Sequence, residues 1–255
     1  DEDRVSLDIW GWQEDEIQPM QLKNKSQEEK KSYLAVLSLK DLRVVQLGTP
    51  EVDEVQLENK ITKTIALAST DAPYRRNYSW DIQLGRDVYL LDLTTGAKEL
   101  IEKNASGAAR LSPEGNYAYW YDARDSSWVA YDLKAKAKIN LTAAIPVPFY
   151  DEIHDSPSLP SSYGAAGWLE GDASFLINDR FDLWKVDPRN PAAAQNITGG
   201  EGRRTQNAFR RERLKVDEVA IDPKEPLILS GFDEVTKKSG FFSANYQGKG
   251  LPKEL

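Results

Sequence analysis

One phrase of apolar and polar residues recurs along this chain. It consists of an apolar run, a polar marker residue near its end, and a second apolar residue eight to ten positions after the marker. Successive markers lie 54, 40, 55 and 58 residues apart, a spacing typical of sequence repeats that each form one supersecondary unit. The pattern therefore predicts a protein built from repeated units. The markers are Ser38, Asp92, Asp132, Asp187 and Asn245, and the closing apolar residues are Leu47, Leu100, Leu141, Ile197 and Leu255.

Alternation around each marker indicates β-strands that are buried on both sides. In a strand, the residues three before, one before and one after a marker point to the same face, and all fifteen residues at these positions are apolar or aromatic. The opposite face is apolar too, as at Val88 and Leu90 or at Trp128 and Ala130. Strands of this kind need sheets stacked face to face. The fifteen residues are Ala35, Leu37, Leu39, Tyr89, Leu91, Leu93, Val129, Tyr131, Leu133, Trp184, Val186, Pro188, Phe242, Ala244 and Tyr246.

Short polar turns divide each unit into about four strands. A turn follows every marker, and an aspartate in that position fixes a tight turn by accepting hydrogen bonds from amides two or three residues on. A second turn, at residues 111–115, precedes an aromatic strand, and similar but less regular turns occur before apolar strands at residues 169–172 and 221–223. We therefore interpret the marker aspartates as structural rather than catalytic.

These observations predict an all-β fold, a β-propeller or partial propeller of about four to five four-stranded blades. We expect at most four complete units, with fragments at both ends. Residues 5–12 resemble a strand, and residues 27–31 resemble a charged linker because helical periodicity is scarce. The prediction is a single propeller segment over residues 1–255, excised from a longer chain, with loop inserts near residues 70–87 and 142–166.

An incomplete ring would leave an apolar blade face in water. Exposing ~400 Å² of apolar surface costs about 10 kcal/mol at ~25 cal/mol per Å², which rivals the stability of a whole domain. We therefore expect either closure as a small propeller or self-association through open blade faces.

Composition and charge narrow the classes of function. A formal net charge of −8 argues against nonspecific binding to nucleic acid, which needs a basic surface. No run approaches the roughly 20 apolar residues of a membrane span, and no signal peptide opens the sequence. The chain has no cysteine, so it forms neither a disulfide nor a cysteine-ligated zinc site.

The sequence carries no recognisable catalytic centre. It contains neither a Gly-x-Ser-x-Gly nor a Ser-x-x-Lys motif, and His154 is its only histidine. His154 lies in a proline-rich stretch beside Asp151, Glu152 and Asp155, whose spacing matches no EF-hand or zinc motif. We expect a hydrogen-bonding role for His154 in a loop, and we predict no catalytic residue, cofactor or metal in this segment.

A local basic cluster is the main candidate for a contact site. It contains Arg203, Arg204, Arg210, Arg211 and Arg213, with Phe209 among them. Guanidinium groups bind carboxylates through paired hydrogen bonds, so the cluster and His154 are candidates for contact with a substrate or a neighbouring domain. The alternative interpretation is a solvated rim paired with Glu201, Glu212 and Asp217.

Seven stretches together resemble the propeller region of bacterial serine peptidases of the prolyl oligopeptidase family, in particular the dipeptidyl-aminopeptidase-like members. The resemblance spans most of residues 5–246, and the insert at residues 145–168 is its most specific part. Glu114 stands where the family usually has aspartate, and residues 135–137 replace its Thr-Gly turn. The stretches are SW at 79–80, RDVYLLDLTTG at 86–96, LSPEG at 111–115, IPVPFYDEIHD at 145–155, YGAAGW at 163–168, DRFDLWKVDP at 179–188 and AIDP at 220–223.

The resemblance implies a parent protein in which a C-terminal α/β-hydrolase domain, not contained in this chain, holds the catalytic residues. The propeller of such peptidases gates and positions peptide substrates, and the resemblance places the parent in the cell envelope or periplasm. The acidic residues that bind the peptide amino terminus in relatives match no motif here, so none is assigned. The alternative is a stand-alone propeller that binds a peptide, a protein or a glycan through its loops.

Overall fold

The computed structural model describes residue 7 and residues 9–58, 63–81 and 85–255. The chain divides into two compact units. Unit 1 comprises Asp1–Leu57 and Ile65–Ala105, and unit 2 comprises Glu58–Thr64 and Ser106–Leu255.

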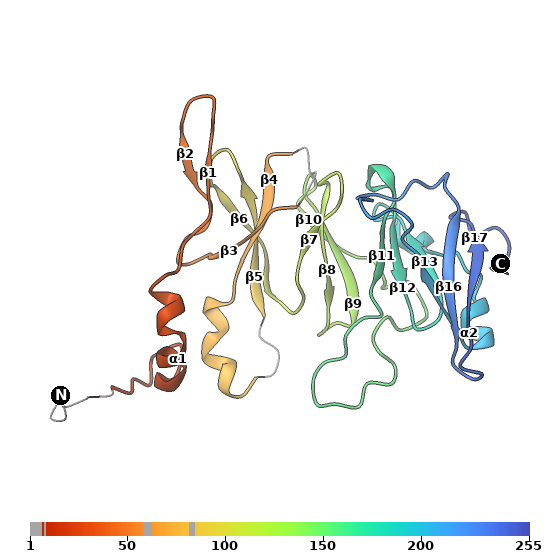
Figure 1. The fold of residues 1–255 in the computed structure, drawn as a ribbon, viewed down its shortest axis with the longest axis horizontal. Helices are drawn as coiled ribbons and strands as arrows, with labels where there is room; N and C mark the ends of the chain where they lie inside the picture. Colours follow the sequence, from red (N-terminus) through yellow and green to blue (C-terminus); the bar gives the residue numbers. More distant parts are fainter. Residues whose placement is uncertain (1–6, 8, 59–62, 82–84) are drawn as a thin grey trace. The chain divides into compact units, whose positions relative to one another are not determined.

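Unit 1 contains one α-helix, one 3-10 helix, a two-stranded hairpin and one four-stranded antiparallel sheet among its described residues (Figure 1). The hairpin is β1–β2, and the sheet has the order β3-β4-β5-β6, so each strand pairs with its neighbour in sequence. The elements are α1 (Gln18–Glu28), β1 (Ala35–Leu37), β2 (Val44–Gln46), β3 (Glu54–Gln56), β4 (Ile65–Thr70), the 3-10 helix η1 (Ala72–Ser79), β5 (Arg86–Asp92) and β6 (Lys98–Ala105).

The described part of unit 2 forms three four-stranded antiparallel sheets, again each with its strands in sequence order. The first sheet comprises β7 (Arg110–Leu111), β8 (Tyr117–Asp122), β9 (Ser127–Asp132) and β10 (Ala137–Asn140). The second comprises β11 (Ala165–Trp168), β12 (Phe175–Asn178), β13 (Leu183–Val186) and β14 (Gln195–Asn196). The third comprises β15 (Asn207–Arg211), β16 (Leu227–Asp233), β17 (Ser239–Ala244) and β18 (Lys253–Glu254), and the short helices are η2 (Glu170–Asp172), η3 (Pro191–Ala193) and α2 (Glu201–Thr205).

The described strands confirm the predicted fold class. Four four-stranded antiparallel meanders, each the size of one propeller blade, follow one another along the described chain. The blades of unit 2 stack face to face, because one apolar cluster joins the sheet of β7–β10 to that of β11–β14 and a second joins β11–β14 to β15–β18. Trp168 shows this packing: its ring stacks on Phe175 at 4.7 Å and on Tyr117 of the preceding blade at 5.5 Å. The β11–β14 sheet is therefore buried on both faces, as the sequence predicts.

The polar markers fasten the hairpins between the third and fourth strands of the blades. The Oδ1 atom of Asp92 accepts hydrogen bonds from the amides of Thr94 at 2.7 Å and Thr95 at 3.0 Å. Asp132 accepts the corresponding bonds from Lys134 and Ala135 at 2.9 and 2.8 Å. Asp187 and Asn245 also accept bonds from amides in their own turns. The structural interpretation of the markers is confirmed.

A second buried aspartate joins two neighbouring blades. Asp172, in the turn between β11 and β12, accepts a hydrogen bond from the Ser112 hydroxyl at 2.6 Å. It also accepts bonds from the amides of Glu114 and Asn116, both at 3.1 Å. The turn between β7 and β8 is thus completed by a carboxylate from the next blade.

Several expectations about the chain ends are wrong. Residues 18–28 form α1, although the sequence indicates little helix. The helix forms because Pro19 lies in its first turn and good helix formers follow. The sequence pattern does not reveal it, because no residue of the helix is buried. The described residues 7 and 9–12 are not in a strand, and the rest of the strand predicted over 5–12 lies outside the described residues. At the other end, β18 completes the last sheet, so no fragment remains there.

The first and last repeats also differ in burial from the expected pattern. Leu37 and Leu39 were expected on a buried face, but they are exposed because β1 pairs with β2 alone among the described strands. The closing residues Leu100 and Leu255 are exposed as well, whereas Leu47, Leu141 and Ile197 are buried. Register shifts between β5 and β6 accompany the change at Leu100, and Ile101 is buried instead.

Candidate functional site

The topology brings several loops of unit 2 to one end of its blades. In a four-stranded meander, the turn between strands two and three lies at the same end as the connection from strand four to the next blade. At this end lie the β12–β13 and β16–β17 turns, the insert between β10 and β11, and α2 between β14 and β15 (Figure 1). We call the charged residues gathered there the rim cluster. It comprises Glu152, Asp179, Arg180, Arg203, Arg210 and Glu234.

The β12–β13 turn forms around the buried carboxylate of Asp179. Its Oδ1 atom accepts hydrogen bonds from the amides of Phe181 at 2.6 Å and Asp182 at 2.7 Å. Its Oδ2 atom accepts a bond from the indole of Trp184 at 2.9 Å. Burial raises the pKa of the Asp179 carboxyl, although these donors favour the ionised form. The carboxylate therefore fixes the turn from which Arg180 projects.

Asp182 joins the same turn to α2. Its Oδ1 atom accepts hydrogen bonds from the Thr198 hydroxyl at 2.6 Å and from the amide of Gly202 at 3.0 Å. Its Oδ2 atom accepts a bond from the amide of Arg203 at 3.1 Å. These amides belong to the first turn of a helix, where backbone donors have no partner within the helix. Asp182 thereby sets the position of α2 and of the Arg203 side chain.

Arg203 anchors the insert between β10 and β11. Its guanidinium donates to both carboxylate oxygens of Glu152, at 2.7 and 3.3 Å, and lies 3.8 Å from Asp179. The hydrogen bond with Glu152 raises the pKa of Arg203. The guanidinium carbon also lies 5.3 Å from the centroid of the Phe181 ring. The charge of Arg203 is thus already matched by carboxylates of the chain itself.

Arg210 fixes the far side of the insert. Its guanidinium donates to the carbonyl oxygens of Phe209 at 2.6 Å and Arg180 at 2.9 Å, and it lies 5.8 Å from the centre of the Tyr163 ring. Burial lowers the pKa of Arg210. The Tyr163 hydroxyl in turn accepts a hydrogen bond from the amide of Glu152 at 2.7 Å. Arg203 and Arg210 together therefore hold both ends of the segment from Glu152 to Tyr163.

The other predicted arginines are not part of the rim cluster. Arg204, next to Arg203 on α2, forms an exposed pair with Glu201 at 2.6 and 2.8 Å. Arg211 follows Arg210 in β15, so its side chain points to the opposite face of the sheet. There it donates to both oxygens of Glu218 at 2.8 Å. Burial alone would lower the pKa of Arg211, but its hydrogen bonds with Glu218 and Tyr246 raise it.

His154 takes part in hydrogen bonds within the insert. Its Nε2 atom lies 2.8 Å from the carbonyl oxygen of Ser158 and 3.0 Å from the hydroxyl of Ser156. The neighbouring Asp151 accepts a bond from the amide of Ile153 at 3.2 Å. In the part of the chain that the structure describes, no three acidic or histidine side chains gather in a way that would hold a metal ion.

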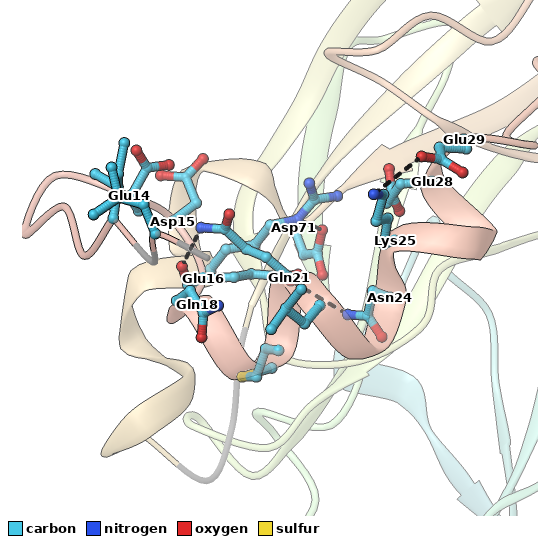
Figure 2. Close-up of a pocket in the computed structure, with 15 residues that line it drawn as sticks. Glu14, Asp15, Glu16, Gln18, Gln21, Asn24, Lys25, Glu28, Glu29 and Asp71 are labelled. Atoms are coloured by element: carbon cyan, nitrogen blue, oxygen red, sulfur yellow. Dashed lines mark hydrogen bonds and ion pairs between the residues drawn. The ribbon is translucent and has the colours of Figure 1, made fainter. Parts of the chain in front are cut away.

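Unit 1 holds a separate cavity of about 920 Å³ beside α1 (Figure 2). Acidic side chains dominate its walls, with six carboxylates against two cationic groups. Part of the charge is paired internally, since Asp71 binds Arg75 at 2.8 Å and Glu29 lies 3.8 Å from Lys25. The charged lining residues are Glu14, Asp15, Glu16, Glu28, Glu29, Asp71, Lys25 and Arg75, and the apolar ones are Leu7, Ile9, Met20 and Leu22.

Sequence reasoning named Glu152 but did not pair it with an arginine, and it missed Asp179, Asp182 and the helix beside the cavity. Asp179 and Asp182 flank an aromatic residue in a polar turn between two apolar strands, and this pattern is the signal that could have indicated them. Glu152 and Arg203 lie 51 positions apart, so no local pattern connects them. Within the described residues, no helix is long and apolar enough to cross a membrane.

No protein family model matches the chain, and a comparison with curated proteins finds no match. Solved structures of β-propeller proteins are similar to it. One is TolB from Acinetobacter baumannii, with 11% identity and a TM-score of 0.36 over 82% of this chain and 48% of TolB.

Two of the similar structures come from peptidases. The β-propeller domain of the trilobed protease from Pyrococcus furiosus shows 12% identity and a TM-score of 0.35, over 79% of this chain and 71% of the domain. An acylaminoacyl peptidase in complex with Z-Gly-Gly-Phe-chloromethyl ketone shows 9% identity and a TM-score of 0.39, over 80% of this chain and 32% of the peptidase. Because these scores are low, the fold class rests on the sheets themselves: the chain is built from β-propeller blades.

Proposed function

We propose that this chain is the noncatalytic propeller portion of a serine peptidase. In this proposal it positions and gates peptide substrates for an α/β-hydrolase domain elsewhere in the parent protein. The proposal starts from the resemblance of the seven sequence stretches to prolyl oligopeptidase-family propellers. It assigns the contact with substrate or hydrolase domain to the insert that the rim cluster holds in place.

The observation that carries the proposal is the construction of the insert. Phe149 is buried in the blade core, and Glu152 is held by Arg203 through two hydrogen bonds. Between these anchors and Tyr163, the insert displays Ile153, which is 68% exposed, and Leu159, which is 38% exposed. A loop that is fixed at its base and presents apolar side chains loses little conformational entropy when it contacts a peptide or a domain. This is the property that a gating surface needs.

The pairing within the rim cluster limits the kind of contact that we propose. Arg203 and Arg180 are already bound to Glu152 and Glu234, the latter pair at 2.6 Å. A free carboxylate would have to displace one of these partners, and separating such a pair leaves a partly buried charge behind. We therefore propose that the arginines position the insert, and that the insert makes the contact.

The parent peptidase, with its hydrolase domain, provides the test. Arg203→Gln removes the anchor of Glu152, whereas Arg204→Gln changes the adjacent residue of the same helix and only an exposed pair. We expect Arg203→Gln to change the ratio of kcat/KM for a dipeptide anilide to that for a long peptide, and Arg204→Gln to leave this ratio unchanged. Equal ratios in both variants would contradict the gating role. Peptide hydrolysis by the 255-residue chain alone, abolished by His154→Ala, would contradict its noncatalytic role.

The second candidate is a stand-alone propeller that binds a ligand through its loops. The acid-lined cavity beside α1 favours it, because a cationic peptide would complement the excess of carboxylates. Calorimetric titration of the 255-residue chain with lysine-rich and glutamate-rich peptides distinguishes the candidates. Binding of the lysine-rich peptide that is lost in Glu16→Gln would support the binding module, and no binding would oppose it.

A further inference from the structure

The β1–β2 hairpin is half of a blade. Its marker Ser38 follows β1 at the turn to β2, just as Asp92 ends β5 at the turn to β6, so β1 and β2 correspond to the third and fourth strands of the other blades. In each complete blade the third strand pairs on both sides, as β5 pairs with β4 and β6. Among the described residues, β1 pairs only with β2. One edge of β1 therefore lacks the second strand that the repeat supplies elsewhere.

The backbone of β1 shows which groups this edge presents. The amide of Ser38 donates to the carbonyl of Arg43, and the amide of Leu47 donates to the carbonyl of Leu34, both at 2.9 Å. Because the direction of backbone groups alternates along a strand, the N–H and C=O groups of Ala35 and Leu37 point to the other edge. Such an edge is a template for a further strand. Apolar side chains surround it, with Leu37 52% and Val44 64% exposed.

A segment of the same unit has the complementary features. Residues 9–12, which we call the arm, are exposed and extend outside any strand. Ile9 is 77% exposed, Trp10 65% and Trp12 88%, and these residue types favour strands. In a strand, Trp10 and Trp12 would share one face. The arm also precedes β1 in sequence, as the second strand precedes the third in every complete blade.

The attachment of the arm determines whether it can pair with β1 of its own chain or only with β1 of another molecule. Arg76 holds the base of the arm through Asp15 at 3.2 Å and through the carbonyl of Gln13. The 11 residues of α1 then follow, a helix of about 16 Å, and in Figure 1 this helix lies between the arm and the β1–β2 hairpin. Four extended residues span about 13 Å. While Arg76 holds its base, the arm is therefore too short to reach the β1 of its own chain.

We propose that the arm of one molecule pairs with the free edge of β1 in a second copy of this chain. The exchange is reciprocal, because each copy has one arm and one free edge of β1. A twofold axis then pairs the arm of each copy with the β1 edge of the other. The partner is thus a second copy of this chain, joined through an added strand at each hairpin. This inference is independent of the proposed peptidase role, because it concerns residues of unit 1 alone.

Sedimentation equilibrium of the 255-residue chain at micromolar concentrations tests the pairing. Leu37→Pro removes the amide that points to the free edge. The two hydrogen bonds that join β1 to β2, from Ser38 to Arg43 and from Leu47 to Leu34, do not involve this amide and remain. Leu37→Thr changes the same side chain but keeps the amide, so it is the matched control. We expect a dimer whose dissociation constant rises at least about tenfold in Leu37→Pro and less than about threefold in Leu37→Thr. A monomeric wild-type chain, or equal effects of the two substitutions, would overturn the proposal.

Cross-linking identifies the source of the strand. The chain has no cysteine, so Trp12→Cys and Ala35→Cys can each be introduced alone. When the two single variants are mixed with a short bismaleimide, strand exchange predicts a cross-linked species of twice the mass of one chain. Trp80→Cys, which changes another exposed tryptophan of unit 1, replaces Trp12→Cys in the control mixture and should give no such product. Cross-linking only within the double variant at high dilution would show that the arm folds back in its own chain, and would overturn the proposal.

Discussion

Asp172 is the residue whose substitution tests the joint between neighbouring blades. Its carboxylate accepts hydrogen bonds from Ser112, Glu114 and Asn116, and the residue is 3% exposed. Removal of the carboxylate leaves the Glu114 amide without its acceptor and the Asn116 amide with only the Ser112 hydroxyl, at 3.2 Å, in a confined turn. Hydrogen bonds to charged groups contribute about 1.5 to 3 kcal/mol each, and bonds that share one acceptor are not additive. We therefore expect Asp172→Ala to lower the free energy of unfolding of unit 2 by about 5 kcal/mol.

Because of the backbone conformation at this position, a second substitution can separate the loss of hydrogen bonds from the strain of a Cβ atom. Asp172 has φ of +53°, a conformation that costs alanine about 1 kcal/mol more than glycine. Asp172→Gly should therefore recover about 1 kcal/mol of the loss, because it removes the same hydrogen bonds without the strain of a Cβ atom. Asp172→Asn keeps an acceptor oxygen and should lose about half as much as Asp172→Ala.

Urea unfolding followed by tryptophan fluorescence provides the measurement. At a slope of about 2 kcal/mol per molar urea, a loss of 5 kcal/mol lowers the midpoint of the unit 2 transition by about 2.5 M. Asp125→Ala, a substitution at an exposed aspartate of the β8–β9 turn, is the control and should lie within about 0.5 kcal/mol of the wild type. A loss below about 1 kcal/mol in Asp172→Ala would refute the assignment of Asp172 as the joint between blades. Fast hydrogen exchange confined to the amides of Glu114 and Asn116 would support it.

Three further predictions concern the core and the rim of unit 2. Gly202→Ala should destabilise unit 2 by about 2 kcal/mol in the same urea assay, although alanine favours helices, because its Cβ atom would lie 2.6 Å from the carbonyl oxygen of Phe181; a stabilised variant would contradict this. Trp168→Ala should cost about 4 kcal/mol and Trp168→Phe clearly less, since the phenyl ring can still stack on Phe175; equal losses would show that stacking is unimportant. Because burial raises the pKa of Asp179, the folded state binds its proton more tightly than the unfolded state, so this residue's contribution to stability falls as pH rises from about 4 through the raised pKa. The urea midpoint of the wild type should therefore fall relative to that of Asp179→Asn as the pH rises through this range. A wild-type midpoint that instead rises relative to the variant would contradict the predicted direction.

The repeated parts of the fold were predictable because one physical rule governs each copy. The alternation around Asp92 and Asp132 predicts strands buried on both sides, and their place before a turn predicts hydrogen bonds to amides two and three residues on. Such features depend on neighbours in sequence. By contrast, α1 has no buried residue, so its helix leaves no apolar periodicity to detect.

The rim cluster shows why a site is harder to predict than the blades that hold it. Arg203 and Arg204 are adjacent in sequence, yet one binds Glu152 of a distant insert and the other binds Glu201 of its own helix. Arg210 and Arg211 separate for a different reason, because successive residues of β15 point to opposite faces. The sequence indicates where the arginines gather, whereas the choice of partner depends on turns of other blades.

The bond between Ser112 and Asp172 also affects how the chain folds during its synthesis. The two residues are 60 positions apart, so the β7–β8 turn leaves the ribosome long before the carboxylate that completes it. At about 5 to 20 residues per second, the delay is roughly 3 to 12 seconds. During this interval the Glu114 amide lacks its carboxylate acceptor, the Asn116 amide has only the Ser112 hydroxyl of its own turn, and the face of the β7–β10 sheet that Trp168 later covers is open. The β7–β10 blade thus gains this support only when the next blade has emerged, and a chain stalled within this window would expose an aromatic surface to chaperones.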